Sequence, residues 1–378
     1  MSASSFSGFP ADARILGLDI GSISVDVVLL DGLGTPLYSR YVRHHGQPDK
    51  VLCAELEALE RTHAGIAAAV TGTGADRVGR LLGACAVNEV IAQVAAASFR
   101  CPQARSVIDI GGQDSKYIQL EPAGEGDGLR LKDFSVSSMC ASGTGSFLDQ
   151  QATRLGLDIE TEFGEAALRS RAPARIAGRC SVFAKSDMIH LQQKGTPVED
   201  IVAGLCHALA RSFKANVVGV KALELPVALV GGVAANAGVV KALRSVLHLE
   251  EDGLFVPEDF ALSGAFGAAL FLLGGQGEAV PYKGLAAFRE GLRQRVPMKT
   301  LVPLQPVSVS PPGCRGASDE GPKVSAGFMP PLRPSASSLP DGAGTRGLPG
   351  RPEARIPEGG SPSSAPREPA ASPLAADD

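Results

Sequence analysis

Two cysteines stand at positions where a thiol can do chemistry. Cys140 directly precedes a run of small residues in the segment "SSMCASGTGSFLDQ", and Cys180 also precedes a predicted helix. A cysteine so placed is a buried core thiol, a nucleophile or a metal ligand. A nucleophile needs a base nearby, for which His190 and His207 are candidates. The residues alone leave these three roles open.

Three glycine turns, each after an apolar strand, predict a phosphate site. Glycine lets backbone N–H groups approach phosphate oxygens that a Cβ would keep away. An aspartate just before a turn suits Mg²⁺ or its waters, and the third turn is predicted to open a helix, whose N-terminus favours an anion. Neither a P-loop nor a dinucleotide fingerprint occurs in the chain. The turns are Asp19-Ile20-Gly21-Ser22, Asp109-Ile110-Gly111-Gly112-Gln113-Asp114 and Gly231-Gly232-Val233-Ala234.

The elements that must position these turns recur along the chain. The stretch "RILGLDIGS" runs into "VDVVLLDG", which predicts two strands joined by a Gly-Ser turn, with a third strand after Asp31-Gly32. Residues 106–120, "SVIDIGGQDSKYIQL", repeat the design of strand, aspartate, glycine turn and strand. The recurrence predicts an internal duplication.

The second half is predicted to be more helical. One helix covers 142–155 and ends at Gly156. A longer amphipathic helix follows Thr196, with Thr196 as N-cap, Pro197 in the first turn and Glu199 three residues after the cap, the pattern of a capping box.

The amino-acid composition excludes several classes of function. The 378 residues carry 36 basic and 40 acidic side chains without long runs of one sign, which speaks against a nucleic-acid groove or a membrane patch. No apolar run reaches the roughly 20 residues of a membrane span. The N-terminus also lacks a cationic start followed by an apolar core, so we expect a cytoplasmic protein. In that reducing compartment, seven scattered cysteines without a CxxC pair argue against a disulfide framework. Fold signals occupy 13–290, and the Pro/Gly/Ser-rich 300–378 is predicted to be a disordered tail.

The motifs resemble those of a known superfamily. "GLDIGS", "IDIGGQD" and "VALVGGVAAN" are similar to the two phosphate motifs and the adenosine motif of the actin, sugar kinase and Hsp70 ATPases. "CASGTGSFLDQ" and "RCSVFAKSD" resemble the BadF/BadG/BcrA/BcrD ATPases, the activators of 2-hydroxyacyl-CoA dehydratases and benzoyl-CoA reductases. The resemblance implies an α/β fold with two duplicated ribonuclease H-like subdomains, about 13–105 and 106–275, around a nucleotide cleft.

The resemblance also implies a site for ATP and Mg²⁺. Asp19, Asp109 and Gln113 would be catalytic, and Asn236 would help to hold the adenosine. The other implied nucleotide-binding residues are Gly21, Ser22, Gly111, Gly112, Asp114, Gly231, Gly232 and Ala234.

For the cysteines, the resemblance implies a 4Fe-4S cluster bound by Cys140 and Cys180 and shared between the two subunits of a homodimer. ATP hydrolysis would drive a low-potential electron from a donor such as ferredoxin or flavodoxin to an acyl-CoA dehydratase or reductase. The cysteines at 53, 85, 101 and 206 are expected to be structural.

Two alternatives stay open at this stage. A small-molecule kinase of the sugar kinase type would use the same fold, with the cysteines as packing residues. A nucleotide-dependent scaffold that does not hydrolyse ATP is suggested by Ile23 and Asp26, which stand where the family usually has a second hydroxyl and a lysine.

Overall fold

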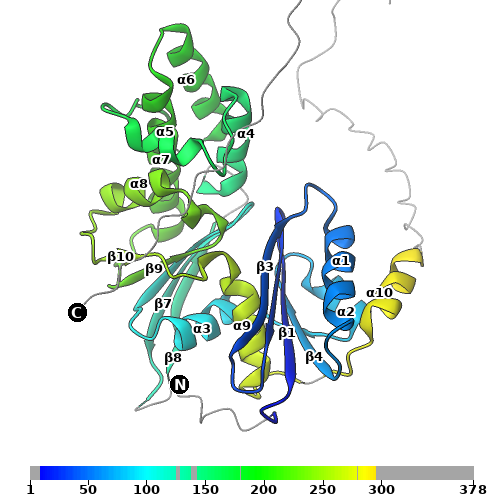
Figure 1. Cartoon of the computed structure of the whole chain (residues 1–378). Helices are drawn as coiled ribbons and strands as arrows, with labels where there is room; N and C mark the ends of the chain where they lie inside the picture. The colour runs from blue at the N-terminus through cyan, green and yellow to red at the C-terminus, as the bar shows by residue number, and fades with distance from the viewer. Residues whose placement is uncertain (1–8, 125–127, 138–142, 179, 279, 295–378) are drawn as a thin grey trace, which may run out of the picture. The chain divides into compact units, whose positions relative to one another are not determined.

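The computed structural model describes residues 9–124, 128–137, 143–178, 180–278 and 280–294 (Figure 1). All of them belong to one compact unit, Met1–Thr300. The predicted tail, 300–378, and Cys140 lie outside the described residues.

The first sheet has the strand order β3-β2-β1-β4-β5. Its first three strands form an antiparallel meander, while β4 and β5 run parallel to β1. The predicted meander is confirmed, because alternating turn residues and apolar runs fix these hairpins locally. The strands are β1 (Arg14–Ile20), β2 (Ser24–Leu30), β3 (Pro36–Arg43), β4 (Ile66–Thr71) and β5 (Cys85–Ala86).

The second sheet repeats this topology in the order β10-β9-β6-β7-β8. Strands β6, β7 and β8 form the antiparallel meander, and β9 and β10 run parallel to β6. The duplicated α/β fold predicted from the sequence is therefore confirmed. The strands are β6 (Ser106–Ile110), β7 (Ser115–Pro122), β8 (Leu129–Val136), β9 (Val227–Val230) and β10 (Leu254–Phe255).

Each sheet buries its apolar side chains under its own group of helices (Figure 1). Leu285 and Phe288, near the end of the described chain, return to the core of the first sheet. The helices of this group are α1 (Pro48–Glu60), α2 (Ala75–Leu82) and α10 (Gly284–Arg293). The group of the second sheet is α4 (Gly145–Leu155), α5 (Phe163–Arg169), α6 (Ser181–Gln193), α7 (Val198–Phe213) and α8 (Ala237–Leu247).

Two further helices, α3 (Glu89–Arg100) and α9 (Ser263–Leu273), lie between the sheets (Figure 1). Helix α3 follows the first sheet but packs into a core with β6, β7 and β9, whereas α9 follows the second sheet and packs against β1, β2 and β4. Helix α9 packs closely on β1 and on α3 because small residues lie at both contacts. A Cβ on Gly17 of β1 would collide with the Ala265 carbonyl of α9, and a Cβ on Gly267 of α9 would collide with the Ala92 carbonyl of α3. The exchange of helices ties the two halves together.

The helix ends differ in how well they were predicted. Gly156 ends α4 in the left-handed conformation that glycine favours, as expected. The capping box is wrong: α7 begins at Val198, Pro197 occupies the N-cap position in an extended conformation, and no side chain caps the helix. Thr196 lies too early, because its N–H closes the end of α6 by donating to the Leu191 carbonyl at 3.1 Å. Among the described residues, no helix combines the length and apolarity needed to cross a bilayer.

Candidate functional site

A cavity of about 1200 Å³ opens between the two sheets, and both halves line it. Its size and its mixture of polar groups suit a nucleotide-sized ligand. Of the predicted site residues that the structure describes, two do not line it: Ala234 is buried and Cys180 lies at the start of α6. The predicted residues that do line it are Asp19, Gly21, Ser22, Asp109, Gly111, Gly112, Gln113, Asp114, Gly231, Gly232 and Asn236.

The two halves build matching walls. Asp19 near the end of β1 lies against Gly72, which follows β4, and Asp109 near the end of β6 lies against Gly231, which follows β9. Both glycines have a left-handed backbone, with φ of 88° and 85°. A Cβ on Gly231 would stand only 2.6 Å from Oδ1 of Asp109. These glycines therefore let each carboxylate pack directly on the neighbouring strand's turn.

The first two glycine turns pack against each other at the cavity. A Cβ on Gly112 would lie 2.3 Å from Cγ1 of Ile23 and 2.8 Å from the Ser22 hydroxyl, so only a glycine lets the two turns approach this closely. The start of α4 is bound to the second turn, since the N–H groups of Gly145 and Ser146 donate to the carbonyls of Gly111 and Gly112, both at 2.9 Å. A shift of this turn would therefore be transmitted to α4.

The third glycine turn does not lead directly into a helix. Between β9 and α8 the chain makes a short 3-10 turn, Gly232–Ala235, and Asn236 then caps α8 by accepting a hydrogen bond from the Val239 N–H at 3.1 Å. The prediction that the glycines open the helix themselves needs this correction. The Asn236 Nδ2 is buried and finds no hydrogen-bond partner among the described residues, so the cavity offers a ligand an unused donor.

Lys116 lines the cavity, although nothing in the sequence placed it there. Its buried ammonium lies 2.7 Å from Glu89, 2.9 Å from Asp114 and 3.5 Å from Asp109. Burial alone would lower the pKa of Lys116, but the three carboxylates raise it, so the lysine stays charged. Gln93 donates to the Asp109 carboxylate at 3.2 Å and fixes its orientation.

Within the described part of the chain, Asp19 and Asp26 of the first half form no ion pair of this kind, whereas Asp109 and Asp114 do. Burial, followed by the charges of Glu89 and Asp109, raises the pKa of Asp19 to about 7. Burial and the neighbouring Asp19 raise the pKa of Asp26 well above its ordinary value. This excess of carboxylate oxygens fits Mg²⁺, which prefers oxygen ligands. No group of three or more His, Cys, Asp or Glu side chains within the described ranges forms a ready metal cage, so the ion would rely on phosphates and water.

Strand β3 of the first half reaches the second half through Arg43 and Tyr41. Arg43 on β3 contacts Asp149 of α4 at 2.8 Å and Glu160 at 3.3 Å. Tyr41, two residues earlier, brings its hydroxyl against the third glycine turn, where a Cβ on Gly232 would lie 2.9 Å from it. Strand β3 thus joins the first half to the walls of the second, a contact that the sequence analysis missed.

The cysteines fall into different environments. Cys180 is the half-buried N-cap residue of α6, and the next residues include Val182 and Phe183, each 66% exposed. Cys206 is buried, which raises the pKa of its thiol to about 12. Cys101 is also buried, whereas Cys53 and Cys85 are half-buried.

Comparisons with known proteins agree with this geometry. The model of the BadF/BadG/BcrA/BcrD ATPase family matches residues 16–271. The activator of 2-hydroxyisocaproyl-CoA dehydratase from Clostridioides difficile is 35% identical over 185 residues, which are 49% of this chain and 66% of that protein. The activator of lactoyl-CoA dehydratase from Anaerotignum propionicum is 32% identical over 260 residues, 68% of this chain and 96% of the relative.

A solved structure is similar as well. The activator of the 2-hydroxyisocaproyl-CoA dehydratase from Clostridium difficile with bound ADPNP matches with a TM-score of 0.61 and 31% identity, covering 69% of this chain and 95% of that one. The family expected from the sequence motifs is confirmed. The chain belongs to the BadF/BadG/BcrA/BcrD ATPase family.

Proposed function

We propose that this protein is an ATP-hydrolysing iron–sulfur activator, which passes a low-potential electron to a 2-hydroxyacyl-CoA dehydratase or a benzoyl-CoA reductase-like partner. One observation carries the proposal. The second glycine turn holds the first residues of α4 through the two hydrogen bonds at Gly145 and Ser146, and Cys140 stands a few residues earlier in the chain. Hydrolysis at the turn would therefore move the segment that bears this cysteine.

The ATP would lie between the glycine turns. Asp19 and Asp109 would hold Mg²⁺ through its waters, and Gln113, which is exposed in the cavity, would orient the attacking water. Gly231 and the unused donor of Asn236 would bind the adenosine. Phosphoryl transfer needs mainly positioning and neutralisation of charge, which these groups and the ion provide.

The cluster would be shared between two identical subunits. A 4Fe-4S cluster takes four thiolates, so Cys140 and Cys180 of each of two copies would complete the set. Two observations support Cys180 in this role: its side chain is half-buried at the start of α6, and the exposed Val182 and Phe183 beside it offer an apolar surface for a second copy. When bound, the cluster would supply the one-electron chemistry, with ferredoxin or flavodoxin as the donor.

The proposal is tested by the iron content and absorption spectrum of anaerobically prepared protein. We expect about four irons per dimer and a broad visible absorption in the wild type. Cys140→Ser and Cys180→Ser should lose both, whereas Cys53→Ser, a change at another half-buried cysteine, should keep them. Iron-free wild-type protein after reconstitution, or unchanged iron in both variants of the proposed ligands, would contradict the proposal.

A further inference from the structure

The internal duplication allows the two halves to be compared position by position. In the second half, the register of β6 and β7 places Lys116 directly opposite Asp109. In the first half, the register of β1 and β2 places Asp26 directly opposite Asp19. The position that carries an ammonium in one half therefore carries a second carboxylate in the other.

The residue on the other side of each aspartate, on the parallel neighbouring strand, also differs between the halves. On its other side Asp19 is in register with Thr71 of β4, whereas Asp109 is in register with the apolar Val230 of β9. Residues in register on neighbouring strands present their side chains on one face, a few ångströms apart. The first half thus aligns three oxygen-bearing side chains, Asp26, Asp19 and Thr71, and all three line the cavity.

Two of these side chains hold oxygen atoms without partners. Asp26 is 6% exposed and Thr71 is 0% exposed, yet Oδ1 of Asp26 and Oγ1 of Thr71 find no hydrogen-bond partner in the part of the chain that the structure describes. A buried polar atom without a partner is costly, and a buried carboxylate more so. Both residues line the cavity, which points to a bound species that supplies the missing contacts.

The charges indicate what that species is. In the second half Lys116 contacts three carboxylates, while no ion pair to Asp19 or Asp26 is found among the described residues. Two facing carboxylates, one of which has an oxygen atom without a partner, favour a hard cation, and the neighbouring hydroxyl of Thr71 is an oxygen ligand of the same kind.

We propose that Asp19, Asp26 and Thr71 form a binding site for a hard, oxygen-liganded cation, K⁺ or a divalent ion, which replaces in the first half the ammonium that Lys116 supplies in the second. This ion is additional to the Mg²⁺ that accompanies ATP, because its ligands are protein oxygens that are present before the nucleotide binds. The site belongs to the cavity of the proposed function but does not depend on hydrolysis.

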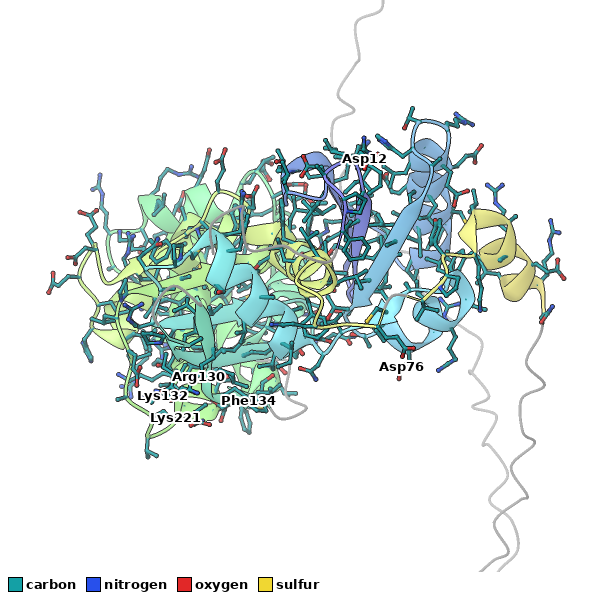
Figure 2. All side chains as sticks on the ribbon, turned by 90° about the horizontal axis from the view of Figure 1, so that it is seen from below. Asp12, Asp76, Arg130, Lys132, Phe134 and Lys221 are labelled. Atoms are coloured by element: carbon teal, nitrogen blue, oxygen red, sulfur yellow. The ribbon has the colours of Figure 1, made fainter. Side chains whose placement is uncertain are left out.

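The test uses the full chain, freed of nucleotide and of loosely bound metal, at constant ionic strength set with tetramethylammonium chloride. Thermal unfolding is followed while KCl or MgCl₂ is added, and Mn²⁺ binding is counted from the electron paramagnetic resonance signal of the free ion. The variants are Asp26→Asn, which keeps the shape, and Asp26→Lys, which restores the residue type of the second half. Asp12→Asn is the matched control, since Asp12 is an exposed acid of the first half (Figure 2).

We expect one of the two salts to raise the unfolding temperature of the wild type and of Asp12→Asn saturably, by several degrees. Both Asp26 variants should lose at least half of that shift. If the ion is divalent, one Mn²⁺ per chain should bind to the wild type and not to the Asp26 variants; if the shift appears with KCl alone, the ion is K⁺. A wild type that responds to neither salt, or an Asp26→Asn variant that responds as the wild type does, would overturn the proposal.

A shared proton between the carboxyl groups is the competing explanation. It predicts that the protein is indifferent to both salts, and that result would also overturn the cation site; stabilisation of metal-free protein by lower pH is expected under either explanation. Because these measurements involve neither ATP turnover nor iron, an inactive or cluster-free protein would leave their outcome unchanged. Failure of the cation site and failure of the proposed function can therefore be told apart.

Discussion

Lys116→Met removes the buried ammonium that contacts three carboxylates of the cavity, while it keeps most of the length of the side chain. Removing one partner of a buried ion pair costs about 3–5 kcal/mol, because the other charge stays buried. Of the three partners only Asp109, whose side chain is 10% exposed, is deeply buried; Glu89 and Asp114 are 33% and 42% exposed, and water screens them. Gln93 also continues to donate to Asp109.

These contacts favour a loss below that range, about 2–3 kcal/mol in the free energy of unfolding. In a domain of this size the loss corresponds to a fall of roughly 5–10 °C in the unfolding temperature. The assay is urea unfolding of nucleotide-free protein, compared by midpoint at unchanged slope. Lys132→Met is the matched control, since Lys132 lies on the surface of β8 and pairs there with Glu224 (Figure 2). We expect it to cost no more than about 1 kcal/mol.

A second substitution separates charge from packing. If the loss comes from an uncompensated carboxylate, Lys116→Met combined with Asp109→Asn should be more stable than Lys116→Met alone, because the amide no longer needs a cation. Equal midpoints for Lys116→Met and Lys132→Met would refute the electrostatic reasoning, as would a double variant whose losses simply add.

Three further predictions concern a glycine, a carboxylate and a thiol. Gly231→Ala should lower the rate of ATP hydrolysis at least about 10-fold, because its Cβ would displace Asp109. Gly195→Ala is the control for backbone strain, since Gly195 has a similar φ of 73° with open space around it; equal activities would contradict the prediction. The pKa of about 7 for Asp19 makes folded, metal-free protein bind more protons than the unfolded chain, so its free energy of unfolding should fall as the pH rises from 5 to 8, and Asp19→Asn should flatten this dependence. A stability that rises over this range would contradict the assignment. Burial raises the pKa of Cys206 to about 12, so iodoacetamide at pH 8 should alkylate this thiol only after the protein unfolds, as followed by mass spectrometry. Rapid alkylation of Cys206 in the folded protein would contradict its burial.

The sequence revealed those features that depend on neighbouring residues. The repeated order of apolar strand, aspartate and glycine turn predicted both antiparallel meanders and the first two glycine turns, because the residues that form a hairpin are close together in the chain. The left-handed Gly156 at the end of α4 was predicted for the same reason.

Features that depend on tertiary contacts stayed hidden. A lysine in a strand is usually exposed, so Lys116 looked ordinary until the register with Asp109 placed it inside the cavity. The capping box at Thr196 failed because the end of α6 takes up the Thr196 N–H. The pairing of Arg43 with Asp149 joins residues far apart in the chain, for which one sequence carries no signal.

ATP hydrolysis itself tests the central claim most directly. The measurement is phosphate release from ATP in the presence of Mg²⁺ by the wild type, by Asp109→Asn and by Asp76→Asn, a control at an exposed acid of α2 (Figure 2). We predict steady release by the wild type, a decrease of about 100-fold in Asp109→Asn and a change below about twofold in Asp76→Asn. A wild type that binds ATP without releasing phosphate, or an Asp109→Asn variant as active as the wild type, would contradict the account.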